Sequence, residues 1–283
     1  AHRPPHLVDS MPQRKEETVT ASSDGAHARI YGCDFTSAPK RAKPLTLAHC
    51  VLDGDCLRVL HVKRLSTFTE FEQALTMHGP WVMGIDFPFG QPRELLENLG
   101  WPIEWSAYVA LVESMGKEAY EKTLRSYGSR LFRRTDRAPK SRSPMQLDFT
   151  PVGKMFFQGA PRLLRSGATI VPCCPGDSGR IVLEAYPKLV AEALSGRGSY
   201  KSDDRYKQTD QHRQIREQIV RASATATTYG VHVEWSDGLD AIAAGDPTGD
   251  MLDAVLCAIQ AAWGWGRRNS GYGVPQDCDQ AEG

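Results

Sequence analysis

Apolar residues gather in short runs along the first third of the chain, and polar or turn-forming residues bound each run. Runs of this length, rich in β-branched and aromatic residues, are typical of strands. Asp53-Gly54-Asp55 separates two of the runs and favours a hairpin turn between them. The pattern predicts four strands, over residues 29–35, 45–52, 57–65 and 81–86.

A helical spacing follows the third predicted strand. Phe68, Phe71 and Leu75 recur at intervals that place them on one apolar face. Thr69 and Glu72 have the spacing of a capping box, so we expect this helix to begin at Thr69. Hairpins followed by a helical crossover imply a mixed sheet, antiparallel at one side and parallel in the middle. This order of elements predicts an α/β fold.

The rest of the chain alternates less regularly. We interpret residues 92–180 as an insertion that holds a helix near 104–127 and a region rich in Pro and Arg. Regular alternation resumes with a fifth predicted strand over residues 180–187. Helical spacing after this strand predicts three helices, near residues 188–194, 206–229 and 249–263.

The two ends of the chain have little to bury. Residues 1–29 are polar and Pro-rich, which predicts a disordered leader. Residues 269–283 are rich in Gly and Asp and predict a flexible tail. The expected domain therefore spans residues 30–268, with the insertion inside it.

Composition and charge exclude some classes of protein. The 283 residues contain 34 Lys+Arg and 34 Asp+Glu, so a polycation that coats nucleic acid through charge excess is excluded, although a locally basic groove is not. No run of about eighteen apolar residues occurs, so no membrane span is expected. The seven cysteines contain no C-x-x-C pair, which disfavours a zinc site or a disulfide framework and favours a cytoplasmic location.

Acidic residues end three of the predicted strands, at Asp34, Asp86 and Glu184. Asp250 and Asp253 open the last predicted helix, where both can point to one side of its first turn. Strand ends in an α/β sheet are where sites collect. Clustered carboxylates repel each other and need a cation, and Mg2+ or Mn2+ are the hard ions that oxygen ligands prefer. Two such ions about 4 Å apart would support attack of water on a phosphodiester.

Each acid also has a plain structural interpretation. Asp250 can be an acid favoured by the helix dipole, and a single strand-end Asp is commonly a turn or cap residue. The combination of Asp34, Asp86 and Asp253 nevertheless favours a metal site, because clustering uncompensated acids is costly.

Four short blocks of the chain carry a resemblance: Ile30–Asp34, Val82–Gly90, Glu184–Pro187 and Asp250–Ala254. In this order they resemble the family catalogued as domain of unknown function 429, which is regarded as a predicted nuclease with a ribonuclease-H-like fold. The resemblance covers roughly residues 30–265. The second pair of blocks also looks like the Holliday-junction-resolvase branch of that fold.

This resemblance implies a ribonuclease-H-like mixed five-stranded sheet flanked by helices, with the insertion between strands four and five. In such nucleases, acids on the first strand, at the end of the fourth and on the last helix bind two Mg2+ or Mn2+ ions. The matching residues here are Asp34, Asp86 and Asp253, with Asp250 as a fourth ligand. Glu184 lies where the fold does not usually place a metal ligand, and as a candidate catalytic residue it would orient the substrate or a basic neighbour.

The implied activity is hydrolysis of DNA or RNA phosphodiester bonds, leaving 3′-hydroxyl and 5′-phosphate ends. Resolvase-like relatives often act as dimers, so a homodimer is a further expectation of the resemblance. The long insertion departs from the minimal fold and leaves the substrate structure undefined.

Basic residues crowd into residues 122–142, where Asp136 is the one acid. Such an arm could contact phosphates and make binding sensitive to salt, although charge runs are also common on solvated faces. Aromatic residues flank the arm and could stack on bases or anchor the core: Tyr127, Phe132, Phe149, Phe156 and Phe157. The candidate substrate-binding residues are Arg130, Arg133, Arg134, Arg137, Lys154 and Lys188, with Lys201 as a further candidate.

Two other classes of function stay open. An ATP-dependent phosphotransferase of the actin and sugar-kinase type shares the strand topology, but the four residues after Asp34 include no glycine for a phosphate turn. A non-catalytic nucleic-acid-binding or protein-binding module would keep the fold and bind no metal. Mn2+ binding and cleavage assays discriminate these classes from a nuclease.

Overall fold

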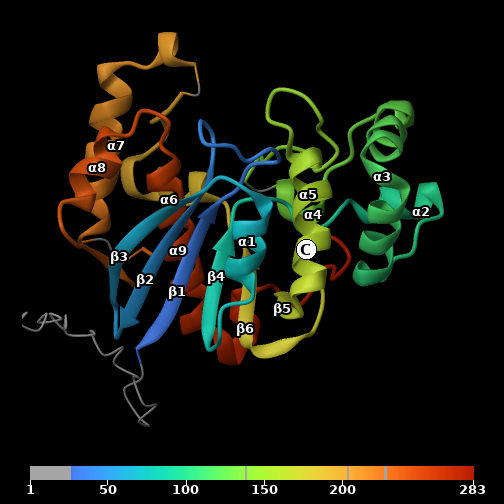
Figure 1. The fold of residues 1–283 in the computed structure, drawn as a ribbon, viewed down its shortest axis with the longest axis horizontal. Helices are drawn as coiled ribbons and strands as arrows, with labels where there is room; N and C mark the ends of the chain where they lie inside the picture. Colours follow the sequence, from blue (N-terminus) through green and yellow to red (C-terminus); the bar gives the residue numbers. More distant parts are fainter. Residues whose placement is uncertain (1–26, 138, 203, 226–227) are drawn as a thin grey trace, which may run out of the picture.

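A seven-stranded sheet forms the centre of the computed structural model, which describes residues 27–283 except 138, 203, 226 and 227. Its strand order is β5-β6-β4-β1-β2-β3-β7 (Figure 1). The strands are β1 (Ala28–Asp34), β2 (Leu45–Asp53), β3 (Cys56–Leu65), β4 (Trp81–Ile85), β5 (Ala168–Val171), β6 (Asp177–Glu184) and β7 (His232–Trp235).

The sheet is mixed, as the sequence predicts. Strand β2 is antiparallel to both of its neighbours, β1 and β3, whereas β1, β4, β6 and β5 run parallel to one another. The expected number of five strands is wrong, because β5 and β7 add a short parallel strand at each edge. The predicted mixed α/β sheet flanked by helices is confirmed.

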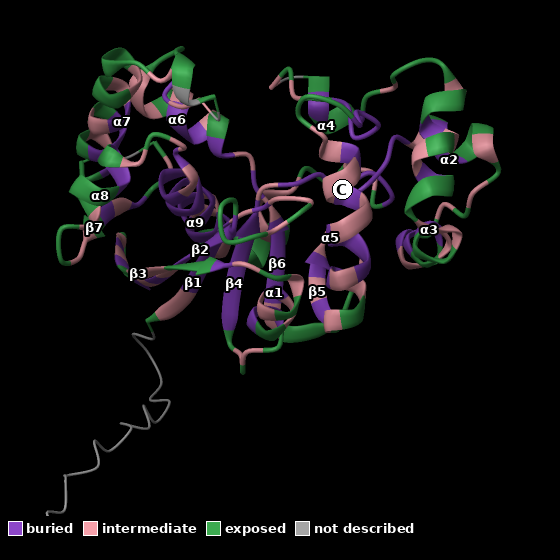
Figure 2. Ribbon diagram, turned by 45° about the horizontal axis from the view of Figure 1, so that its top comes forward, coloured by how far each residue is buried: buried purple, intermediate pink, exposed green. Residues whose placement is uncertain are grey.

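Helices of the first half of the chain cover one face of the sheet. Buried residues of α1, α3 and α5 join the odd-numbered side chains of β1 and β4, among them Cys33 and Ile85, in one apolar core. Figure 2 shows this buried interior between α1, α5 and the strands. The helices are α1 (Phe68–Leu75), α2 (Arg93–Leu99), α3 (Trp105–Tyr127), α4 (Arg134–Arg137) and α5 (Val152–Ser166).

Helices of the second half cover the opposite face. The Ala-rich helix α9 packs directly on β1, β4 and β2, and α6, α7 and α8 lie outside it. A second apolar core fills this side, with Ile30 and Val82 from the strands and Leu252 and Val255 from α9. The elements are α6 (Pro187–Ser195), α7 (Asp210–Ser223), α8 (Leu239–Gly245) and α9 (Asp250–Gly266), with 3-10 turns at Arg205–Lys207 and Arg268–Gly273.

The first helix begins earlier than the sequence predicts. Its N-cap is Thr67, whose hydroxyl accepts a hydrogen bond from the amide of Glu70 at 3.2 Å, while the Glu70 carboxylate accepts from the amide of Thr67 at 2.9 Å. The expected pair, Thr69 and Glu72, has the same spacing but lies inside the helix. The Glu70 carboxylate also accepts from the amide of Ser66 at 2.7 Å, a hydrogen bond that further stabilises the start of the helix at the earlier pair.

The two ends of the chain differ from each other in the structure. Most of the predicted leader lies outside the described residues. The final residues, expected to be a flexible tail, pack against the insertion: Ala281 and Glu282 are buried. The Tyr108 hydroxyl donates to the carbonyl of Ala281 at 2.7 Å. No helix in the described part of the chain is both long and apolar enough to span a membrane.

Candidate acid cluster at the sheet edge

Asp34 and Asp86 lie side by side at the carboxyl edge of the sheet. Asp34 ends β1, and Asp86 directly follows β4. The two strands are parallel, with Cys33 paired with Ile85, and the amide of Asp86 continues the ladder by donating to the carbonyl of Cys33 at 3.0 Å. Neighbouring strands are about 4.8 Å apart, so this register brings the two acids together.

Two glycines explain why both acids face α9. A Cβ placed on Gly32 would lie 1.9 Å from the carbonyl oxygen of Ala254, and one on Gly84 would lie 2.5 Å from that of Cys257. The helix therefore packs directly on the strand backbone at these positions. Side chains two residues apart share a face of a strand, so each aspartate, two residues beyond a glycine, lies on the face that α9 covers.

Helix α9 brings two more carboxylates to the same edge. Asp253 precedes Ala254, which packs against β1, and its side chain is fully buried. Asp250 opens the helix one turn earlier. The Tyr200 hydroxyl donates to Asp253 Oδ1 at 2.6 Å, and Lys201 Nζ forms an ion pair with Asp253 Oδ2. We name Asp34, Asp86, Asp250 and Asp253 the acid cluster.

The carboxylates of the acid cluster act on one another. Burial, together with the charges of Asp253, Asp250 and Asp86, raises the pKa of Asp34 well above its ordinary value, against the opposing effect of Lys201. Burial and the charge of Asp253 raise the pKa of Asp86 to about 7. Burial also raises the pKa of Asp250. The four carboxylates of the cluster therefore lack enough nearby positive charge to offset their mutual repulsion.

Lys201 supplies a positive charge within the cluster. Burial works against its ammonium group, but the carboxylates of Asp253 and Asp34 outweigh burial and raise its pKa above the ordinary lysine value. Lys201 thus stays charged, and its ion pair holds Asp253. Asp34, Asp86 and Asp250 are partly exposed, so solvent or a ligand can reach them.

The oxygen donors of the acid cluster are of the kind that bind a divalent ion, but the side chains are not placed close enough to hold one. Its donors are hard carboxylate oxygens, and their mutual repulsion is what a bound cation would relieve. Within the described residues, however, no three His, Cys, Asp or Glu side chains are placed to hold a metal ion. Lys201 forms an ion pair with Asp253, one of the three acids that the sequence predicts as metal ligands.

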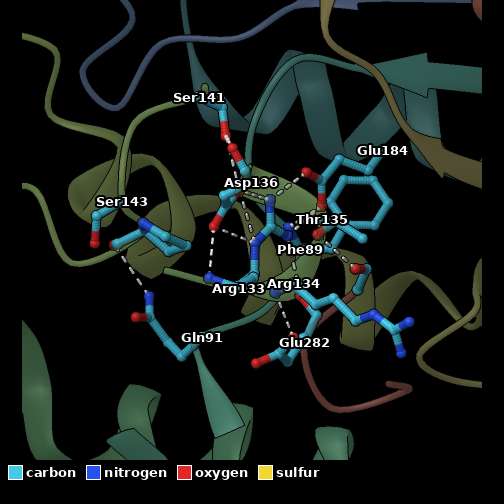
Figure 3. Close-up of polar contacts among 12 residues, drawn as sticks. Phe89, Gln91, Arg133, Arg134, Thr135, Asp136, Ser141, Ser143, Glu184 and Glu282 are labelled. Atoms are coloured by element: carbon cyan, nitrogen blue, oxygen red, sulfur yellow. Dashed lines mark hydrogen bonds and ion pairs between the residues drawn. The ribbon is translucent and has the colours of Figure 1, made fainter. Parts of the chain in front are cut away.

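Glu184 takes a different position from the acid cluster. It pairs with Ile85 in the register of β4 and β6, so its side chain lies on the face of the sheet opposite Asp86. The guanidinium of Arg133 donates to both of its carboxylate oxygens, and the amide of Phe89 donates to Oε2 at 2.8 Å (Figure 3). Glu184 thus contacts a basic neighbour, Arg133, and its charge contributes to the raised pKa of Asp86.

Arg133 is not available to a substrate. It is 3 % exposed, and it also donates to Asp136 and to the carbonyl of Glu282 (Figure 3). Its neighbour Arg134 donates its amide to the Glu282 carboxylate at 2.9 Å. The structure thus places Arg133 at the junction of the insertion, β6 and the last residues of the chain, where its buried guanidinium is bonded to protein groups and is not placed to bind a phosphate.

The other candidate substrate-binding residues stay near the surface. Arg137 and Arg130 are exposed, and Arg134 is exposed and ion-paired with Asp277. Lys154 lies 3.8 Å from Glu121, and Lys188 lies 3.6 Å from Glu192. These positions leave cationic groups on the surface of the insertion. Lys188 is the exception, because it lies on α6, outside the insertion, so the candidate residues do not form one surface group.

The flanking aromatic residues divide into two sets. Phe156 is fully buried and Tyr127 and Phe157 pack against the same core, so these three anchor the insertion. Phe132 and Phe149 are exposed. A groove of about 640 Å³ lies nearby between α3 and α5, but no residue of the acid cluster lines it; the lining is Lys117, Glu118, Glu121, Lys122, Arg125, Ser126 and Lys154.

Sequence reasoning missed two residues that support the cluster. Tyr200 contacts Asp253 directly, and Arg216 holds the Tyr200 carbonyl at 2.7 Å. No local motif marks either residue, since Tyr200 comes to the site through the packing of the loop before α7 and Arg216 through the packing of α7 itself. The only available signal was the uncommon placement of Arg216 at a position that helical spacing assigns to the buried face of α7.

Comparison with known proteins identifies a family. The family described as "Protein of unknown function (DUF429)" matches the chain over residues 9–277. Neither a curated protein nor a solved structure shows significant similarity to the chain.

Proposed function

The chain belongs to the DUF429 family, and from its acid cluster we propose that it is a metal-dependent nuclease that hydrolyses phosphodiester bonds of nucleic acid. One observation carries the proposal: the carboxylates of Asp34, Asp86 and Asp253, from the ends of two parallel strands and from a helix, lie at one sheet edge, where they act on one another and on Lys201. Carboxylates in this number at one edge are the ligands that Mg2+ or Mn2+ prefers.

The strand arrangement supports the proposal. Five neighbouring strands, β3-β2-β1-β4-β6, form a mixed sheet in which β2 is antiparallel to β1 and β3, and such a mixed sheet is compatible with the ribonuclease-H-like fold that the resemblance implies. Asp34, Asp86 and Asp253 then occupy the first strand, the end of the fourth and the last helix. This is the placement that the sequence resemblance implies for metal-binding acids.

The protein residues would have separate roles in this proposal. Asp34 and Asp86 are partly exposed and would hold the metal, with Asp250 beside them. Tyr200 and Lys201 fix the orientation of Asp253. A divalent ion, when bound, would supply an activated water and neutralise charge on the phosphate.

A cleavage assay tests the proposal. Branched, hybrid and single-stranded DNA and RNA substrates are incubated with Mn2+ and the wild-type chain, the Asp34→Asn variant or the Asp253→Asn variant. We expect cleavage by the wild type, with 3′-hydroxyl products, and at least about a 100-fold loss in both variants, since each removes a ligand charge.

The matched control is Asp240→Asn, which makes the same chemical change at an exposed acid in the first turn of α8. It should cleave like the wild type. Cleavage that survives Asp34→Asn would refute the assignment. Binding of nucleic acid without any Mn2+-dependent cleavage would instead favour the non-catalytic binding module.

A further inference from the structure

Phe149 projects into solvent from the loop before α5. It is fully exposed, so its ring buries no apolar surface within the chain. Its backbone has a φ of +66°, a conformation that bulky side chains rarely adopt. Strained backbone of this kind persists only where the surrounding structure holds it, and it is concentrated at functional sites and ligand clamps. Packing within the chain therefore does not explain why a phenylalanine is placed here.

The buried side chain of Gln146 holds the backbone on both sides of Phe149. Its amide group donates to the carbonyl of Asp148 at 3.0 Å and to that of Thr150 at 3.2 Å. The carboxylate of Asp148 in turn accepts from Arg125 Nη1 at 2.8 Å and from Arg125 Nη2 at 3.1 Å. These bonds tie the loop to α3 and hold it in the conformation that exposes the ring.

A basic groove lies beside this loop. It is the groove of about 640 Å³ between α3 and α5, and Arg125, which contacts Asp148, is part of its wall. Its charged lining residues are four cations and two acids. Lys117, Lys122 and Arg125 follow one another along α3, over about 12 Å at about 1.5 Å per residue. Lys154 comes from α5, on the other side of the groove.

Positive charge also surrounds the residue that precedes Phe149. The hydrogen bond from Arg125 lowers the pKa of Asp148, and the charges of Lys154 and Arg130 lower it further. Three cations from three parts of the insertion are thus within electrostatic range of the Asp148 carboxylate. A phosphate bound beside the exposed ring would meet the same charges.

A phosphate chain that carries unpaired bases would use both features. Lysine and arginine neutralise phosphates along a strand, and an exposed aromatic ring stacks on a base of any identity. A base inside a duplex is already stacked and paired, so its face is not open to the ring. The row of cations on α3 is about as long as three nucleotides at about 3.4 Å each, which favours a strand over a single nucleotide.

We propose that the groove between α3 and α5, with Phe149 at its edge, binds an unpaired strand of nucleic acid, with phosphates on Lys122 and Lys154 and one base stacked on the Phe149 ring. DNA and RNA share this chemistry. The inference rests on the proposed function for the choice of nucleic acid as the ligand. It adds a substrate class, nucleic acid with a single-stranded segment, held at a groove that no residue of the acid cluster lines.

Binding of labelled oligonucleotides tests the proposal. Fluorescence anisotropy with the full chain in EDTA compares a DNA strand of about 12 nucleotides, the RNA strand of the same sequence and the blunt DNA duplex. We expect the wild type to bind either or both single strands about 10-fold more tightly than the duplex, because only an unpaired base can stack on the ring. A difference between the two strands shows which nucleic acid is preferred.

Variants separate stacking from phosphate contact. Phe149→Ala should weaken single-strand binding about 10-fold and leave its salt dependence unchanged, whereas Phe149→Trp keeps an aromatic ring and should bind like the wild type. Lys122→Ala should reduce the slope of the single-strand affinity against salt concentration, on logarithmic scales, by about 0.7. If Phe149→Ala does not fold, Phe149→Gly takes its place, because glycine adopts a positive φ without strain.

A second phenylalanine of the basic arm provides the control. Phe132 is 44 % exposed, and Phe132→Ala makes the same chemical change away from the residues that line the groove. It should bind single strands like the wild type. Equal single-strand affinity of the wild type and the folded Phe149 variant overturns the proposal, as does a preference for the duplex or no binding of any oligonucleotide. Adenosine monophosphate that binds as tightly as the strand would overturn it in favour of a small nucleotide ligand.

The cleavage assay separates this inference from the proposed function. Single-strand binding that needs Phe149, without Mn2+-dependent cleavage of any substrate, would sustain the inference and remove the nuclease. Cleavage that needs Asp34, with equal single-strand binding by the wild type and Phe149→Ala, would sustain the nuclease and remove the inference.

Discussion

The guanidinium of Arg133 forms a two-point contact with the carboxylate of Glu184, Nη1 to Oε2 at 2.7 Å and Nη2 to Oε1 at 2.6 Å. Arg133 belongs to the insertion, and Glu184 ends β6. The side chain of Arg133 is 4 % exposed and that of Glu184 is 26 % exposed. The pair therefore joins the insertion to the sheet through largely buried charges, beside the strand that leads to Asp86.

Removing Arg133 should destabilise the fold. Arg133→Ala leaves the carboxylates of Glu184 and Asp136 without their cation, and breaking a buried pair in this way costs about 3–5 kcal/mol. The free energy of unfolding in urea measures the effect. Arg134→Ala is the control, because this neighbour is exposed and its ion pair with Asp277 should contribute less than about 1 kcal/mol. Equal losses in the two variants would contradict the structural role of Arg133.

Gly32 should be required for the position of α9. The Cβ of Gly32→Ala would meet backbone atoms, the Ala254 carbonyl oxygen at 1.9 Å and the Ala258 amide nitrogen at 2.3 Å, so the helix must move away. We expect a loss of about 3 kcal/mol in the free energy of unfolding, the upper end of the usual cost of overpacking, because the clash is with backbone atoms. Mn2+ binding should weaken as well, because the shift carries Asp253 away from Asp34.

Gly245→Ala is the matched control for this prediction. Gly245 is exposed at the end of α8, and a Cβ there meets nothing within 4 Å. The change should alter stability by no more than about 1 kcal/mol, in the stabilising direction, and leave Mn2+ binding unchanged. If Gly32→Ala is as stable as Gly245→Ala, the close packing of α9 on β1 does not position the site.

The sequence predicts those elements of the fold that short sequence patterns determine, and it misses those that depend on tertiary packing. The strands that carry Asp34 and Asp86 were predicted to within one residue, because long buried runs with polar ends need no tertiary information. Helix α5 was missed because Gly159 and Pro161 lie inside it, and both disfavour helices. A Cβ on Gly159 would lie 2.3 Å from the Phe87 ring, so tertiary packing selects this glycine.

The residues of the acid cluster were also predictable from local patterns, whereas their contacts with the rest of the chain were not. Its acids could be listed from the sequence, because each ends a strand or begins a helix. The ion pair of Lys201 with Asp253 could not be derived, since Lys201 reaches the cluster only through the fold of the loop before α7. Similarly, Arg133 resembles its surface neighbours in the basic arm, and only the packing of the insertion on β6 buries it.

His49 should make the fold sensitive to acid. Its Nδ1 lies 3.2 Å from His61 Nε2, and its ring stacks on Tyr31. Burial and the neighbouring charges of His61, Lys63 and Arg29 lower the pKa of His49 to about 4. The pKa of a histidine in an unfolded chain is about 6.5. Between about pH 4 and this value, His49 therefore binds a proton in the unfolded chain but not in the native chain. Stability should therefore fall as the pH decreases through this range.

The substitution His49→Gln tests this dependence. The variant should lose less stability than the wild type between about pH 6.5 and pH 4, which urea unfolding at several pH values measures. His78→Gln, at an exposed histidine, should follow the wild-type curve. Parallel curves for His49→Gln and the wild type would show that another group causes the acid sensitivity.

Arg142 should contribute to the binding of nucleic acid. It is exposed, and its charge acts on Tyr186, a side chain whose pKa is raised by burial and by Asp86. Arg142 therefore lies within electrostatic range of Tyr186, the residue two after the end of β6, and there it could contact a phosphate of a bound strand. We expect Arg142→Ala to weaken binding of an oligonucleotide in EDTA. The slope of the binding affinity against salt concentration, on logarithmic scales, should fall by about 1, as loss of one phosphate contact does.

The control is Arg221→Ala, at an exposed arginine on α7. It removes the same charge at the other end of the sheet (Figure 1) and should leave this salt slope unchanged. Equal effects of the two substitutions would mean that binding follows overall charge and not the basic surface of the insertion.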